Sequence, residues 1–330
     1  MEKKYRRLCA RLGWAMLFHL LFINVFMLGG MLLYNLLAVT LDDRTYSLGY
    51  ELVYAVLYLA AFMLPVLLFR ILSRKETPVP MGMEPTFPLQ AIPMVLAVLG
   101  INLACAYCNS FFMQLLDTMG IANLLDYVEM AAFRYPEDFV LLHLSLSLVP
   151  AFCEEFLFRG LICARLMPYG KTTAIIASAV LFGLMHGNLG QLFYTTMAGV
   201  MLGWCYVETR SIWPCVIAHM LNNLLGFLSE YWYAALPEGK AVLIDTIVCC
   251  AVMLAGLICL SVMICSRRRK KLPLTGLGNT RPISVQLGAA LPMRERLRGF
   301  FRPSMIVYFV LACGGILFYL LLGGLFAFFE

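Results

Sequence analysis

Charged residues are scarce in this sequence. Asp, Glu, Lys and Arg make up 13% of the 330 residues, whereas a soluble globular domain carries about 25%. Apolar residues account for 62%, so the balance argues against a water-soluble fold. Apolar runs of roughly 20 residues, enough to cross a hydrocarbon core of about 30 Å as a helix, recur along almost the whole chain. The sequence therefore predicts an all-α fold, a polytopic transmembrane helical bundle.

Several other signals are missing. No clear internal repeat is present, which weakens the case for an inverted-repeat transporter. No small-residue cleavage site follows the first apolar segment, and that segment is too long for a secretory signal, so we interpret it as a retained anchor. Cys105 and Cys108 form a C-x-x-C pattern, but it lies inside an apolar run with no second pair, which argues against a metal or redox site there.

Hydropathy divides the chain into eight to nine expected spans with uncertain ends. Three belong to an N-terminal region, 1–138, four to a core, 139–229, and the rest to a C-terminal region, 230–330, which includes a basic cytoplasmic loop at 266–303. The expected spans lie near 12–39, 48–72, 91–116, 139–166, 172–188, 190–207, 211–229, 241–265 and 304–329.

The basic and acidic residues alternate between successive loops. One orientation, with the N-terminus in the cytoplasm, places the basic residues inside and the acidic ones outside, as the positive-inside rule requires. The net charge of +6 is thereby explained by topology and by attraction to anionic lipid, and no nucleic acid is expected as a partner. The inner residues are Lys3, Lys4, Arg6, Arg7, Arg11, Arg70, Arg74, Lys75, Arg165, Lys171, Arg210 and 267–271; the outer ones are Asp42, Asp43, Asp117, Asp126, Glu129, Glu137, Asp138, Glu230 and Glu238.

Three ionisable residues lie within one expected span, at Glu154, Glu155 and Arg159. Left unpaired in the bilayer they would cost roughly 8–10 kcal/mol, so they must face a polar interior. Glu155 and Arg159 are four residues apart and can pair on one helix face. Glu154 lies about 100° around the helix and is free for another role. The alternative is that both glutamates only neutralise Arg159.

Two later spans carry histidine. His186 ends one apolar segment, and His219 shares a helix face with Asn223 on another. Counted at about 1.5 Å per residue from the cytoplasmic turns, these residues can reach the level of Glu154. Three helices would then bring a carboxylate, two imidazoles and an amide together. By contrast, we interpret His19 and His143 as structural or interfacial.

These residues resemble the CPBP intramembrane proteases, a family that includes type II CAAX prenyl endopeptidases and bacteriocin-processing or immunity proteins of bacteria. The resemblance covers about 139–229 and rests on three motifs in the family's order. They are E-E-x-x-x-R at Glu154, Glu155 and Arg159, F-x-x-x-H at Phe182 and His186, and H-x-x-x-N at His219 and Asn223.

The resemblance implies an integral protein of the bacterial cell membrane that hydrolyses a peptide bond of a membrane-associated substrate, either a CAAX-type lipidated protein or a leader peptide. Glu154, helped by His186, would act as general base on water. His219 and Asn223 would donate hydrogen bonds to the oxyanion, and Glu155 and Arg159 would hold the scaffold.

A competing mechanism places a metal, zinc by its donor types, on His186, His219 and Glu154. Other intramembrane protease types fit less well, because the sequence has no G-x-S-G, no H-E-x-x-H and no G-x-G-D with a second aspartate. Two alternatives to an enzyme stay open. The first is a non-catalytic scaffold or immunity protein of the same fold, and the second is a transporter or ion pathway.

Overall fold

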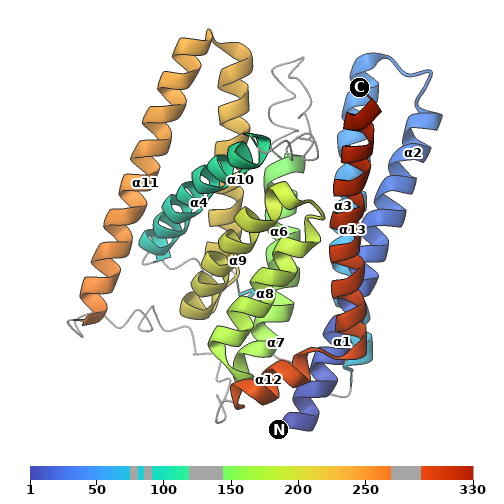
Figure 1. The fold of residues 1–330 in the computed structure, drawn as a ribbon, viewed down its shortest axis with the longest axis vertical. Helices are drawn as coiled ribbons and strands as arrows, with labels where there is room; N and C mark the ends of the chain where they lie inside the picture. The colour runs from blue at the N-terminus through green and yellow to red at the C-terminus, as the bar shows by residue number, and fades with distance from the viewer. Residues whose placement is uncertain (75–80, 85–90, 119–143, 269–290, 330) are drawn as a thin grey trace.

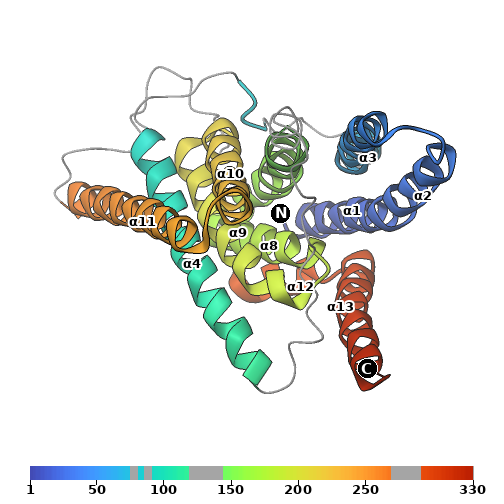
Figure 2. The ribbon, with the colours of Figure 1, turned by 90° about the horizontal axis from the view of Figure 1, so that it is seen from above.

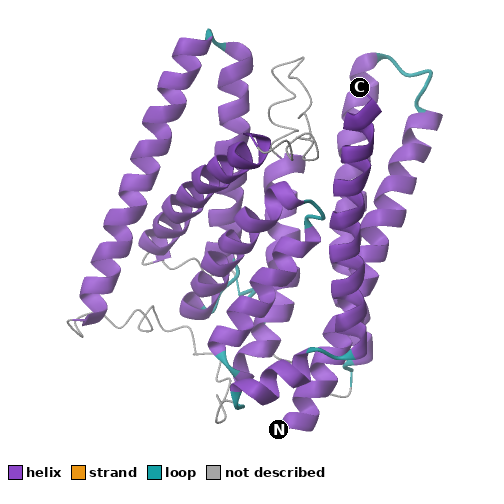
Figure 3. Ribbon diagram, in the orientation of Figure 1, coloured by secondary structure: helices purple, strands orange, loops and turns teal. Residues whose placement is uncertain are grey.

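The chain is an all-helical bundle in the computed structural model, which describes residues 1–74, 81–84, 91–118, 144–268 and 291–329 (Figure 3). No strand occurs among these residues. The N-terminal elements are α1 (Glu2–Leu21), the π-helical turn η1 (Phe22–Met27), α2 (Leu28–Leu37), α3 (Asp43–Leu72) and α4 (Ile92–Thr118). The central ones are η4 (Leu144–Leu148), α6 (Val149–Glu155), η5 (Phe156–Cys163), α7 (Ala164–Leu166), η6 (Met167–Tyr169), α8 (Lys171–Met185), α9 (Leu189–Thr209) and α10 (Trp213–Ala235). The last are α11 (Glu238–Arg268), α12 (Met293–Phe300) and α13 (Pro303–Phe329).

The helices form a central group with a layer on either side (Figures 1 and 2). The continuous helix from η4 to α7 packs with α8, α9 and α10 in the centre. On one side α1 packs against α3 and α13, and α3 also contacts α6. On the other side α4 packs against α9, α10 and α11. The central helices are therefore enclosed by segments from both ends of the chain.

The predicted helical segments are confirmed, with shifts at their ends. Each expected span coincides with a helix or a continuous run of helical elements. Of the expected loop at 266–303, residues 269–290 lie outside the described residues, while α11 continues to Arg268 and α12 occupies Met293–Phe300. That segment is too short and too basic to register as a span, but its apolar residues lie on one face.

The number of membrane crossings differs from the number of helices, because not every helix is long and apolar enough to cross a membrane. In the described residues, four helices are long and apolar enough to cross a membrane, or five if the bent pair α12 and α13 counts as one span. Helix α8 is apolar but short. The count of eight to nine spans therefore stays a prediction, whereas an integral membrane bundle is supported.

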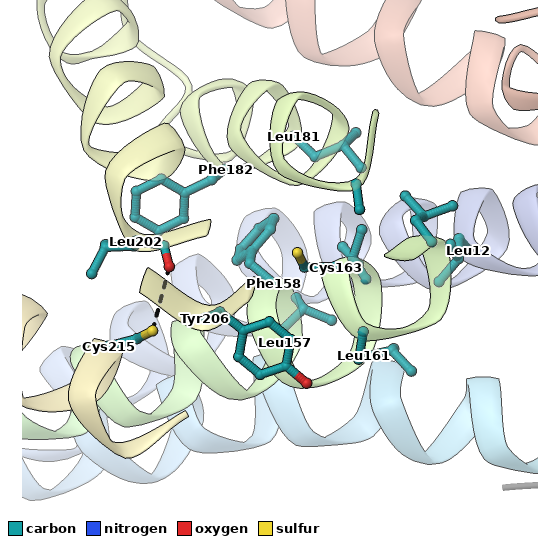
Figure 4. Close-up of a cluster of buried hydrophobic side chains, with 14 of the residues drawn as sticks. Leu12, Leu157, Phe158, Leu161, Cys163, Leu181, Phe182, Leu202, Tyr206 and Cys215 are labelled. Atoms are coloured by element: carbon teal, nitrogen blue, oxygen red, sulfur yellow. Dashed lines mark hydrogen bonds between the residues drawn. The ribbon is translucent and has the colours of Figure 1, made fainter. Parts of the chain in front are cut away.

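The hydrophobic core joins the central helices to α1 (Figure 4). Phe158 of η5 packs edge-on against Phe182 of α8, with ring centroids 5.2 Å apart. The Cys215 thiol of α10 contacts the backbone oxygen of Leu202 in α9 at 3.4 Å (Figure 4). Dispersion contacts such as the one between these two rings, and hydrogen bonds between helices, hold helices together in a bilayer, where burying apolar surface from lipid gains little.

The basic segments gather at one end of the bundle, where the N-terminus and α12 lie together (Figure 1). Gly299 of α12 lies against the Tyr5 ring of α1. The Arg296 guanidinium of α12 donates to the Thr173 hydroxyl of α8 at 2.5 Å. Positively charged segments are retained on the cytoplasmic side, so the expected orientation would place this end of the bundle there; the orientation itself stays a prediction.

Substituting Gly256 tests the contact between α4 and α11. A Cβ at Gly256 would lie 2.7 Å from the Cα of Gly100, so the backbones meet with no room for a side chain. We expect Gly256→Leu to lower the free energy of unfolding by about 1–3 kcal/mol, as overpacking does. Thermal unfolding in detergent measures the effect. Gly314→Leu, whose Cβ would meet nothing within 4 Å, is the matched control; equal melting temperatures for both variants would contradict the close contact.

Candidate active site

The acidic doublet lies at the junction of two kinds of helix. Glu154 and Glu155 end α6, and the π-helical η5, which carries Arg159, begins at the next residue. Insertions of π-helix into an α-helix occur frequently at functional sites. Glu155 and Arg159 are fully buried, and Glu154 is 4% exposed. These charges can persist there only with partners.

Glu155 accepts two hydrogen bonds on one oxygen. Its Oε1 accepts from Nη1 of Arg159 at 2.7 Å and from Nδ1 of His219 at 2.9 Å. The predicted pairing of Glu155 with Arg159 is therefore confirmed. Because a carboxylate only accepts, Nδ1 of His219 must carry a proton, and Nε2 is the ring nitrogen left to exchange one. Glu155 thus orients His219 in addition to neutralising Arg159.

Arg159 ties the doublet to two further helices. Its Nη2 donates to the backbone oxygen of Gly199 in α9 at 3.1 Å. The guanidinium carbon lies 4.5 Å from the ring centroid of Phe182 in α8, a cation–π contact. The first residue of the F-x-x-x-H pattern therefore serves as a platform for the arginine.

Glu154 has one oxygen engaged and one open. The Tyr58 hydroxyl of α3 donates to Oε1 at 2.5 Å. Oε2 is buried with no hydrogen-bond partner among the described residues and lies 3.8 Å from Nε2 of His219. That separation is too long for a direct hydrogen bond but leaves both atoms within reach of one water molecule. Glu154 is therefore not consumed in neutralising Arg159.

His186 is placed by the turn that ends α8. Gly187 has a positive φ of 72°, and glycine adopts this conformation at a helix C-terminus without strain. Asn188 then caps α9 by accepting from the backbone N–H of Gln191 at 2.8 Å. Nδ1 of His186 donates to the Phe182 backbone oxygen at 2.9 Å. This bond fixes the tautomer and leaves a lone pair on Nε2.

Both histidines line a cavity of about 230 Å³ between α4, α8, α9 and α10. Asn223 also lines it, so the structure gathers both members of the H-x-x-x-N pattern there. Glu154 and Glu155 are not among the lining residues, but each has a carboxylate oxygen within 4 Å of a ring nitrogen of His219. The other polar lining residues are Asn102, Gln191, Tyr194, Thr195 and Asn222.

Sequence reasoning missed Tyr58. It belongs to a run of tyrosines at Tyr50, Tyr54 and Tyr58, spaced four residues apart on one face of α3. A row of hydroxyl groups in an apolar span was a usable signal, but it did not indicate which helix the row would face. Of the histidines interpreted as structural, His19 donates from Nδ1 to the Ala61 backbone oxygen at 3.0 Å, and His143 lies outside the described residues.

The donor types of the alternative metal set suit zinc, since it combines two imidazoles and a carboxylate. In the part of the chain that the structure describes, however, no three His, Cys, Asp or Glu side chains are gathered to hold a metal ion. His186, His219 and Glu154 therefore do not form a ligand group as they stand. No step of the mechanism proposed below passes through a metal.

Together, the fold and these contacts define an integral membrane protein with a buried carboxylate–histidine centre. Comparison with known proteins agrees with the description of an integral membrane protein. Residues 136–225 match the model of the family described as type II CAAX prenyl endopeptidase Rce1-like. The chain is also 29% identical over 136 residues to the "Putative membrane peptidase YdiL" of Bacillus subtilis (strain 168), covering 37% of this chain and 55% of that protein. No solved structure matches.

The match spans about half of the curated relative's length. Within that extent the resemblance to the CPBP family, drawn from the three motifs, is confirmed. The segment that matches the family model, 136–225, contains every residue of the three motifs. Over this segment, the chain is similar to a family of CAAX-type prenyl endopeptidases and to a protein described as a membrane peptidase.

Proposed function

We propose that this protein is an intramembrane endopeptidase that hydrolyses a peptide bond of a membrane-associated substrate, with Glu154 as the general base. The observation that carries the proposal is the buried Oε2 of Glu154, which has no partner among the described residues and lies 3.8 Å from Nε2 of His219. The carboxylate that balances Arg159 is Glu155, so Glu154 is left with an oxygen open beside an imidazole.

In the proposed reaction, a water molecule lies between Glu154 and His219. Glu154 removes its proton while the water oxygen bonds to the carbonyl carbon of the substrate. His186 assists by accepting a hydrogen bond from the water on Nε2. Asn223 and a protonated His219 donate to the oxyanion that develops. Glu154 then returns the proton to the leaving nitrogen as the C–N bond breaks.

The proposed substrate class is supported by the description of the matching family, which names CAAX prenyl endopeptidases. A lipidated C-terminal sequence or a leader peptide held at the membrane would suit a site enclosed by apolar helices. We expect the N-terminus to face the cytoplasm, so the substrate would enter from that compartment's leaflet. Purified protein in liposomes, assayed for peptide hydrolysis and for ion flux, tests the proposal. Flux without cleavage would favour the transporter alternative.

Tyr58→Phe should slow hydrolysis about tenfold, because one hydrogen bond to the carboxylate of the general base is lost while the ring is retained. The expected change is in kcat, with KM close to that of the wild type. Tyr54→Phe is the control. Its ring stacks on that of Tyr58, with centroids 5.6 Å apart, and its hydroxyl makes no hydrogen bond to Glu154. If both variants lose the same activity, Tyr58 has no special part in positioning Glu154.

Hydrolysis should persist under strong chelation, because the proposed base is a carboxylate and not a metal-bound water. The measurement is the rate of peptide cleavage after prolonged incubation with a high-affinity zinc chelator, together with elemental analysis of the active protein. Loss of activity that returns on adding back zinc in stoichiometric amount would replace this mechanism with the one based on His186, His219 and Glu154 as ligands.

A further inference from the structure

Asn102 is a buried side chain of α4 that lines the cavity beside the two histidines. It is 1% exposed, and its Oδ1 has no hydrogen-bond partner among the described residues. Helix α4 lies outside the family segment at 136–225 but packs against both α9 and α10 (Figure 1). The residue therefore adds an unpaired polar group to the site from a helix that the family motifs do not include.

Three of the neighbouring polar lining residues already have hydrogen-bond partners. Tyr194 and Asn222 bond to each other, with their polar atoms 2.7 and 3.0 Å apart. The Thr195 hydroxyl donates to the backbone of its own helix at 2.7 Å. Buried carbonyl oxygens are rarely left without a donor, because desolvating them without compensation is costly. Asn102 is thus the lining residue whose acceptor is best explained by a ligand.

The chemistry of the lining indicates what that ligand is. A carboxamide offers one acceptor and two donors, which complement the N–H and C=O of a peptide group. A prenyl or acyl chain in the same cavity would leave Oδ1 of Asn102, and Nε2 of both histidines beside it, facing hydrocarbon without partners. At about 230 Å³, the cavity is also small for a long hydrocarbon chain.

We infer that the cavity is a subsite for the substrate's polypeptide main chain, and that Oδ1 of Asn102 accepts a hydrogen bond from a substrate backbone N–H near the scissile bond. The inference rests on the proposed function and extends it. Any lipid on the substrate lies outside the cavity, against the apolar helix faces. Recognition at Asn102 is therefore independent of side-chain identity and of lipidation.

The experiment uses the full chain in lipid nanodiscs. A library of quenched-fluorescent, unlipidated apolar octapeptides is first screened for a sequence that the wild type cleaves and Glu154→Gln does not. That peptide is then N-methylated at one backbone nitrogen at a time. Each version is measured against wild type, Asn102→Leu and the control Asn109→Leu. Asn109 lies on the same helix but donates to the Gly190 backbone oxygen and does not line the cavity.

We expect Asn102→Leu to reduce kcat/KM for the parent peptide about tenfold while its melting temperature stays at or above that of the wild type, since an unpaired polar group has been removed. One N-methylated peptide should show a similar loss with wild type and no further loss with Asn102→Leu. Asn109→Leu should lower the melting temperature and leave the N-methylation pattern unchanged. The subsite would be overturned if Asn102→Leu kept the wild-type kcat/KM. It would also be overturned if the loss caused by Asn102→Leu multiplied the loss caused by N-methylation at every backbone nitrogen of the peptide.

Failure of the subsite and failure of the proposed function give different results. If the wild type cleaves peptides without regard to Asn102, the subsite is wrong and the protease stands. If no peptide is cleaved, the stabilisation of the wild type by an added parental library peptide is compared with that of Asn102→Leu. A larger stabilisation of the wild type than of Asn102→Leu would support a peptide-binding cavity in a protein without protease activity. Equal stabilisation of the two proteins would refute the subsite.

Discussion

Glu154→Gln should abolish peptide hydrolysis while leaving the protein folded. Removing a general base lowers kcat by about 10²–10⁴-fold, and the amide of glutamine cannot take a proton from water. The variant keeps an oxygen that can accept from the Tyr58 hydroxyl, which bonds Glu154 at 2.5 Å in the wild type. It also removes a buried negative charge. We therefore expect a melting temperature close to that of the wild type and a loss confined to catalysis.

The measurement is kcat with a cleavable peptide in nanodiscs, with thermal unfolding on the same preparation. Glu230→Gln, an exposed glutamate at the far end of α10, is the matched control and should cleave at the wild-type rate. A scaffold or immunity protein would keep its cellular effect in Glu154→Gln, because binding does not require a base. Retention of hydrolysis in this variant would remove Glu154 from the mechanism.

Much of the site was readable from sequence because its residues break strong local rules. Charges and histidines inside apolar helices are expensive, so Glu154, Glu155, Arg159, His186 and His219 were conspicuous before any coordinates. The four-residue spacing of Glu155 and Arg159 gave their pairing directly. The positions of the helical segments followed from hydropathy for the same reason, since apolar runs bounded by Pro, Gly and charge leave few alternatives.

Other features depend on how helices pack, which spacing along one chain does not determine. Tyr58 is 96 residues from Glu154, and its hydroxyl could have faced lipid or any neighbour. Glu155 was expected only to hold the scaffold, yet it also bonds His219, because α10 approaches α6 on that side. The orphan acceptor on Asn102 became visible only with the cavity. Helix α12 was hidden because eight residues, four of them charged, show no membrane signal.

Arg159→Met should be the most destabilising substitution in the site. It leaves Glu155 fully buried with its main cationic partner gone, and breaking a buried ion pair costs about 3–5 kcal/mol. The bond to the Gly199 backbone and the contact with Phe182 are lost as well. Arg6→Met is the control: Arg6 pairs with Glu2 at the same four-residue spacing, but both side chains are more than 40% exposed. An exposed pair contributes about 0–1 kcal/mol, so thermal unfolding should separate the two variants clearly.

Combining Arg159→Met with Glu155→Met separates folding from catalysis. Two apolar residues of similar length replace the buried pair, and such replacement is often neutral or stabilising, so most of the lost stability should return. Activity should not return, because Nδ1 of His219 would lose the carboxylate 2.9 Å away that fixes its tautomer and orientation. Recovery of both stability and hydrolysis would reduce Glu155 to a counter-ion for Arg159. Recovery of stability alone would assign it the second role, that of orienting the imidazole that faces Glu154.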